Sequence, residues 1–99
     1  MRLRELLDAR TVEGVTLREA AELLHAHPTH LVRAFTQAHG VPPHTYLTGR
    51  RVELARRLLL AGQRPVETAV AAGFFDQAHL TRHFRRYLGV SPARYPRPS

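Results

Sequence analysis

Near the end of the sequence, several side chains have the types and spacing that proteins use to read DNA bases. Gln77, Ala78, Thr81 and Arg82 share the outer face of a helix predicted over residues 76–88, together with Arg85. Arginine can donate two hydrogen bonds to guanine O6 and N7, glutamine can pair in the same bidentate way with adenine, and alanine or threonine can contact the thymine methyl group. A solvated surface helix is polar as well, so one such helix does not decide between the two interpretations.

An earlier stretch repeats this arrangement. Thr29, His30, Val32 and Arg33 occupy the equivalent positions of another predicted helix, where Arg33 matches Arg82. Because arginine stands at the same position twice, we favour base contacts over a solvated face. We therefore predict two base-reading surfaces, one on each helix.

These two helices belong to an internal repeat. When the sequence is shifted by 49 residues it aligns with itself without a gap, and the identities are Ala20/Ala69, His30/His79, Leu31/Leu80, Arg33/Arg82, Phe35/Phe84, Gly40/Gly89, Val41/Val90, Pro43/Pro92 and Tyr46/Tyr95. Each copy, roughly residues 16–47 and 65–96, is expected to form a helix–turn–helix pair. Residues 48–62 have no counterpart.

Capping residues mark the starts and ends of helices in these pairs. Thr16 and Glu19 form a capping box, and Gly40 is placed to end the second helix of the first copy. In the second copy, Asp76 is the predicted N-cap of the second helix and Gly89 its end.

Apolar residues at helical spacing predict the core, and no segment shows the period-two alternation of a strand. The residues expected to face inward are Leu3, Leu6 and Leu7 in an opening helix at 2–9; Leu17, Ala20, Ala21, Leu24, Leu31 and Phe35 in the first copy; Val52, Ala55, Leu58 and Leu59 in a helix at 50–61; and Val66, Ala69, Val70, Leu80, Phe84 and Leu88 in the second copy. The predicted fold class is all-α, with residues 1–47 as the first helix–turn–helix subdomain, 48–62 as the linker helix and 63–99 as the second subdomain of a single domain, 1–99.

The charge of the chain is unevenly distributed. Its formal net charge is +7, and all 15 basic residues are arginine. Residues 1–49 hold five arginines and five acidic residues, whereas residues 50–99 hold ten arginines and three acidic residues. A domain with its excess charge in one half is suited to a polyanion.

Composition excludes several classes of protein. The chain has no cysteine, which excludes disulfides, thiolate metal sites and thiol nucleophiles. No apolar run approaches the ~18 residues of a membrane span, and no signal-peptide core follows the first residues. We therefore expect a cytoplasmic location.

Residues 73–95, GFFDQAHLTRHFRRYLGVSPARY, resemble the signature of the AraC/XylS family of bacterial transcription regulators. The first copy and residues 46–59 also match the family pattern. The resemblance implies about seven helices, with two helix–turn–helix units on one long helix reading successive major grooves. It also implies base contacts from Thr29, His30 and Arg33, and from Gln77, Ala78, Thr81 and Arg82.

Seven further arginines are assigned to the DNA phosphates. Contacts to phosphates supply binding affinity that does not depend on the base sequence and that falls as the salt concentration rises. The predicted phosphate contacts are Arg50, Arg51, Arg57, Arg85, Arg86, Arg94 and Arg97. Two positions depart from the family. Pro96 replaces an arginine, so a terminal phosphate contact is either weakened or passed to Arg97. His27 replaces a serine-like cap, which predicts a less firmly held helix start.

The resemblance further implies an asymmetric promoter site in double-stranded DNA, activation of transcription through RNA polymerase, and no cofactor. Most members carry a sensing or dimerisation domain ahead of this one. Because this sequence starts at the first helix, we expect either an excised domain or a stand-alone member.

Three alternative interpretations of the sequence compete with DNA binding. His79 and His83 have metal-ligand spacing, and His25, His27 and His30 cluster, yet no carboxylate completes a known pattern, so we expect no metal. No catalytic triad, phosphate loop or carboxylate pair can be assembled, so we expect no enzyme, and a DNA-repair relative would need a cysteine. The third alternative is a helical protein-interaction module without specific DNA reading.

Overall fold

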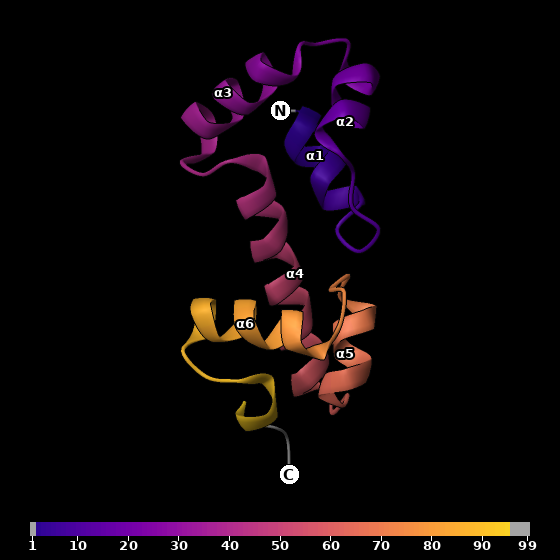
Figure 1. The fold of residues 1–99 in the computed structure, drawn as a ribbon, viewed down its shortest axis with the longest axis vertical. Helices are drawn as coiled ribbons and strands as arrows, with labels where there is room; N and C mark the ends of the chain where they lie inside the picture. The colour runs from indigo at the N-terminus through magenta and orange to yellow at the C-terminus, as the bar shows by residue number, and fades with distance from the viewer. Residues whose placement is uncertain (1, 96–99) are drawn as a thin grey trace. The chain divides into compact units, whose positions relative to one another are not determined.

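The computed structural model describes residues 2–95, which form six α-helices, one 3₁₀ turn and no strand (Figure 1). The elements are α1 (Arg2–Ala9), α2 (Leu17–Leu24), α3 (Pro28–His39), α4 (Pro43–Leu60), α5 (Pro65–Ala71), α6 (Gln77–Leu88) and η1 (Pro92–Arg94). The all-α prediction is confirmed. The chain divides into two compact units, Met1–Leu47 and Thr48–Ser99, with α4 contributing to both. Arg97 lies outside the described residues.

The first unit buries one face of each of its helices around a small core. Leu3 and Leu7 of α1, Ala20 and Ala21 of α2, and Leu31 and Phe35 of α3 form this core. The capping box holds the start of α2: Thr16 Oγ1 accepts from the Glu19 N–H at 3.0 Å, and Glu19 Oε1 accepts from the Thr16 N–H at 2.9 Å. The Thr16 N–H, and to a smaller extent the Thr16 side chain, lower the pKa of the Glu19 carboxyl, because hydrogen bonds to the carboxylate favour its charged form.

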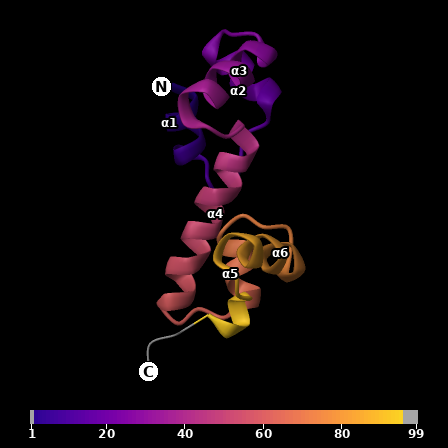
Figure 2. The ribbon, with the colours of Figure 1, turned by 90° about the vertical axis from the view of Figure 1, so that its left-hand side faces the viewer.

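The second unit packs α5 and α6 against the later turns of α4 (Figure 2). Its core contains Val52, Ala55 and Leu59 of α4, Ala69 and Ala72 around the end of α5, Phe74, and Leu80 and Phe84 of α6. The predicted inward positions Val52, Ala55, Leu59, Leu80 and Phe84 are therefore confirmed. Asp76 and Gly89 bound α6 as predicted, with Gly89 in the left-handed conformation at φ 79°.

Several positions predicted to face inward lie at the surface instead. Val66 and Val70 of α5 are 52% and 69% exposed, and Leu88 is also exposed. The buried face of α5 is formed by Thr68 and Ala69, and the Thr68 hydroxyl donates to the Arg64 carbonyl at 2.8 Å. That internal bond satisfies the hydroxyl, so a threonine can occupy the inner position in place of a valine. Leu17 of α2 is likewise partly exposed.

The linker helix begins five residues before the predicted start at residue 48, because α4 opens at Pro43. Proline suits a first helical turn, where its missing N–H has no intrahelical partner. The early start brings Tyr46 and Leu47 onto the first core. The Tyr46 hydroxyl donates to Asp8 Oδ1 at 2.7 Å, which joins α4 to α1.

Within the described residues, no helix is both long and apolar enough to cross a lipid bilayer.

Candidate nucleic-acid interface

Side-chain caps hold the first turns of α3 and α6. His27 Nδ1 accepts from the Thr29 N–H at 3.1 Å, and Asp76 Oδ1 accepts from the His79 N–H at 2.8 Å. Each cap satisfies one of the amide donors that a helix start leaves without an intrahelical partner. The start of α3 is therefore capped, with an imidazole nitrogen in the place of the usual hydroxyl, and the expectation that this start is less firmly held stays a prediction.

The outer face of α3 carries a shallow hollow, lined by residues of three successive turns of α3 and by Leu17 of α2. Its residues are Leu17, Pro28, Thr29, Val32, Arg33, Thr36 and Gln37. Thr29, Arg33 and Gln37 are exposed, and they recur every four residues along the same side of the helix. The Thr36 hydroxyl donates to the Val32 carbonyl at 2.7 Å, so it is occupied within the helix.

The outer face of α6 carries a second hollow, lined by Gln77, Ala78, Thr81, Arg82 and Arg85. When the 49-residue repeat is applied, these five positions fall on Pro28, Thr29, Val32, Arg33 and Thr36, all of which line the hollow on α3. Two helices of the same chain thus present equivalent surfaces, with one arginine at the same place in each. A row of polar and small side chains on an exposed helix face is the form that contacts base edges in the major groove.

The structure places most, but not all, of the predicted base-reading residues in these hollows. His30 is exposed but lies outside the lining of the hollow on α3. Arg85, assigned to phosphate from the sequence, lines the hollow on α6 beside Thr81 and Arg82.

Sequence reasoning missed two residues at these surfaces. Gln37 follows Arg33 by one helical turn, and this spacing was a sufficient signal to include it. Phe75, immediately before the N-cap of α6, lies with Ala78 and Arg82 along a further shallow surface and is 88% exposed. An aromatic residue in a turn normally belongs to the core, so no sequence pattern distinguished Phe75 from the buried Phe74.

The arginines of the hollows differ from those of α4 in their pairing. Arg33, Arg82 and Arg85 make no hydrogen bond or ion pair within the described part of the chain. Arg56, by contrast, donates to both carboxylate oxygens of Glu53, at 2.9 Å from Nε and 2.6 Å from Nη2. This pairing lowers the pKa of Glu53 and, with a smaller contribution from Tyr95, raises that of Arg56. The unpaired guanidinium groups remain open to an anion or a base edge.

The arginines assigned to phosphates lie in different environments. Arg50, Arg57, Arg86 and Arg94 are exposed. Arg51 is half-buried, and burial lowers its pKa because the charged form loses hydration.

The paired histidines of α6 are part of the packing of the second unit. His79 Nδ1 accepts from the Phe75 N–H at 3.1 Å, and the His79 and His83 rings meet edge to face with centroids 4.8 Å apart. The His83 ring also stacks on the Phe74 ring, with the ring centroids 6.1 Å apart. Partial burial is the main cause that lowers the pKa of His83, followed by the charges of His79, Arg82 and Arg86. Among residues 2–95, no group of three potential ligands is placed to hold a metal ion.

A comparison with protein families matches residues 20–97 to a helix-turn-helix domain model. The chain belongs to the AraC-type family of helix-turn-helix domains. This family consists of DNA-binding transcription regulators, and the resemblance of residues 73–95 to its signature is confirmed.

Individual AraC-type proteins resemble the chain over most of its length. An uncharacterised helix-turn-helix transcriptional regulator of Bacillus subtilis, YbfI, is 38% identical over 76 residues, which are 77% of this chain and 28% of that protein. The C-terminal domain of AraT, a response regulator from Geobacillus stearothermophilus, superposes with a TM-score of 0.89 and 31% identity, over 99% of this chain and 85% of that one. The DNA-binding domain of AdpA, solved in complex with a target DNA, superposes with a TM-score of 0.83 and 31% identity, over 94% and 87% of the two chains.

The chain spans about a third of the length of the curated AraC-type relatives it matches.

Proposed function

We propose that this AraC-type domain reads an asymmetric site in double-stranded DNA with α3 and α6 in successive major grooves, and so directs a bacterial transcription regulator to its promoters. The observation that carries this proposal is the pair of hollows with equivalent linings on two helices of one chain. Because their lining residues differ apart from the shared arginine, the two half-sites differ in sequence and the whole site is not palindromic. One chain supplies both reading helices, a task that two subunits share in a dimeric helix-turn-helix protein.

The residues divide into two roles. Thr29, Val32 and Arg33 on α3, and Gln77, Ala78, Thr81 and Arg82 on α6, contact base edges, with His30 at the margin of the first surface. Arg85 reaches either a base or the adjacent phosphate from within the second hollow. Exposed arginines outside the hollows neutralise phosphates, which supplies affinity without sequence preference. These are Arg50, Arg57, Arg86 and Arg94, with Arg51 beside them and Arg97 beyond the described residues.

The charge distribution assigns unequal shares of affinity to the two units. The second half of the sequence carries the whole net charge of +7. Counterion release scales with the number of phosphates neutralised, so α4 and the second unit supply most of the binding to any DNA sequence. The first unit then adds selectivity through α3.

At the promoter, the bound domain activates transcription by contact with RNA polymerase and itself catalyses no reaction. A further sensing or dimerisation domain is part of the full regulator, in keeping with the longer relatives.

The test is to select binding sites for the purified 99-residue protein from random duplexes and to footprint the selected site. Two protected major-groove segments centred about 10 base pairs apart on one face of the duplex are expected. A selected site bound by one monomer confirms that one chain holds both reading helices. No enriched sequence, with binding of equal strength to all duplexes, would overturn the proposal and favour a helical protein-interaction module. A reporter gene whose weakly active promoter carries the selected site then distinguishes activation, in which production of the protein raises reporter expression, from repression, in which it lowers it.

A further inference from the structure

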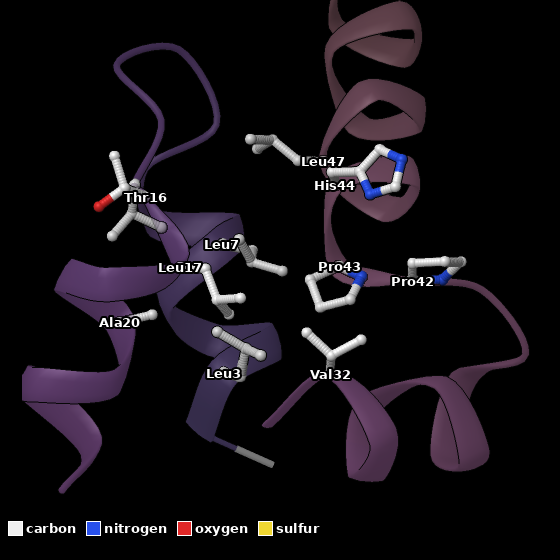
Figure 3. A pocket seen from close by; sticks show the side chains of 11 residues that line it. Leu3, Leu7, Thr16, Leu17, Ala20, Val32, Pro42, Pro43, His44 and Leu47 are labelled. Atoms are coloured by element: carbon white, nitrogen blue, oxygen red, sulfur yellow. The ribbon is translucent and has the colours of Figure 1, made fainter. Parts of the chain in front are cut away.

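The first unit contains a pocket of about 430 Å³, and of the residues that line it only Val32 belongs to the proposed DNA contacts. Its walls come from all four helices of the unit: Leu3 and Leu7 from α1, Leu17 and Ala20 from α2, Val32 from α3, and Leu47 from α4 (Figure 3). Pro42, Pro43 and His44 close one side, and Val15 and Thr16 close another. Because its walls come from four helices and two connecting turns, the space is a partly enclosed pocket within the unit and not a flat apolar face.

The lining defines the chemistry of an occupant. Among residues 2–95, no arginine, aspartate or glutamate lines the pocket, and His44 is the one titratable side chain there. The Thr16 hydroxyl already accepts the Glu19 N–H in the capping box. Leu3, Leu7, Ala20 and Val32 present hydrocarbon, so a charged ligand would lose its hydration without gaining a partner. A volume of about 430 Å³ lies within the range of small-molecule sites and is too small for a folded partner.

Two side chains connect this pocket to the surface that faces DNA. Leu17 and Val32 line the pocket and also line the hollow on the outer face of α3. In Figure 3, Leu17, Val32 and Pro43 point into the same space. A molecule in the pocket would therefore contact the inner side of residues whose outer side belongs to the base-reading surface.

We propose that this pocket binds a small, neutral, apolar molecule of one or two fused rings, and that its binding alters the affinity of α3 for its half-site. The binding itself is independent of the DNA-reading function, whereas the effect on DNA rests on that proposed function. Binding at two sites is linked, so a ligand that changes DNA affinity by some factor has its own affinity changed by DNA by the same factor.

The first experiment titrates the free 99-residue protein with indole, and in parallel with purine, which has the same shape but polar ring atoms. Saturable NMR shifts of the Leu3, Leu7, Leu17, Val32 and Leu47 methyl groups are expected with indole and at least tenfold weaker binding with purine. Indole at ten times its Kd should raise Tm by about 6–11 °C, because it binds the native state alone. Equal binding of the two compounds, or no saturable shift of these methyl groups, would overturn the proposal.

Variants locate the site. Val15→Phe fills the pocket from its edge, and His44→Trp narrows its opening at an exposed position. Both should weaken indole binding at least tenfold, whereas Val66→Phe on the exposed face of α5 should leave it unchanged. Val15→Phe could instead change the oligomeric state of the protein, measured by sedimentation, and leave indole binding intact. In that case a side chain of a second copy occupies the pocket, and the small-molecule proposal is wrong.

The last experiment separates the two parts of the proposal. Duplexes with the first or the second half-site scrambled are titrated in the presence and absence of saturating indole. With indole present, the Kd for the duplex that keeps the α3 half-site is expected to change at least threefold. The Kd for the duplex that keeps only the α6 half-site should not change. Indole binding without any change in DNA affinity would overturn the coupling and leave the site, whereas failure of sequence selection in the absence of indole would overturn the DNA-reading function alone.

Discussion

His27 and Asp76 stand at the same position of the 49-residue repeat, and each side chain caps the helix that follows it. The two caps differ in charge, because a carboxylate precedes α6 and an imidazole precedes α3. A negative charge near a helix N-terminus interacts favourably with the helix dipole, an interaction that a neutral imidazole does not provide.

Replacement of the α3 cap should therefore stabilise the first unit. His27→Asp is expected to raise the free energy of unfolding by about 0.5–1 kcal/mol, since aspartate is a preferred N-cap residue and adds the dipole term. Urea unfolding at pH 7 measures the gain. His27→Ser serves as the uncharged control: it should match the stability of the parent or exceed it slightly, while only His27→Asp should weaken binding to DNA of any sequence. A loss of stability in both variants would show that the imidazole is the better cap at this position.

The arginines of the two hollows should differ from the arginines outside them. Arg82→Ala is expected to cost about 1–3 kcal/mol of binding at the selected site and to relax its preference at one base pair, and Arg33→Ala should do the same in the other half-site. Arg86→Ala and Arg57→Ala should weaken binding to all sequences by a similar factor and reduce the slope of log K against log salt. Fluorescence anisotropy with cognate and random duplexes at two salt concentrations separates the groups. Equal loss on both duplexes for Arg82→Ala would remove this residue from the base-reading surface.

Phe75 should contribute to DNA binding without contributing to the fold. Its ring is 88% exposed beside Ala78 and Arg82, so it can contact a thymine methyl group or the sugar edge when α6 enters the groove. Phe75→Ala is expected to weaken binding at the selected site by about 1 kcal/mol and to leave Tm within 1–2 °C of the parent, as is usual for an exposed residue. Val70→Ala, at another exposed apolar position, is the matched control and should leave DNA affinity unchanged. A large fall in Tm for Phe75→Ala would assign the ring a structural role.

The stability of the second unit should fall in mild acid because of His83. Partial burial and the neighbouring positive charges hold the pKa of His83 below its ordinary value of about 6.5. The unfolded chain therefore binds more protons at this site than the native state does, and the contribution to stability is present above pH 6.5 and is lost as the pH falls below it. Chemical unfolding at pH 7.5, 6.5 and 5.5 measures the decline, which His83→Phe should reduce because phenylalanine keeps the ring stacked on Phe74 and does not titrate. An unchanged pH profile in this variant would contradict the assignment.

Features that depend on a few neighbouring residues were determined by the sequence alone. The capping box of Thr16 and Glu19, the cap at Asp76 and the left-handed glycines Gly40 and Gly89 act within one helical turn, so they hold whatever surrounds the helix. The 12-residue helices α3 and α6 are long enough for periodicity to separate the buried phenylalanines from the face that carries Arg33 and Arg82.

Features that depend on neighbouring helices were decided by the tertiary structure. The seven-residue helix α5 is too short for periodicity to define its inner face, and packing against α4 and α6 turned Ala69 inward and Val66 and Val70 outward. The sequence could not show that Phe75 is exposed while Phe74 is buried, because the two rings differ only in what lies opposite them. Nor could it show the pocket shared by Leu17 and Val32, since a cavity is the space that four separately predicted helices leave unfilled, and only their packing determines that space.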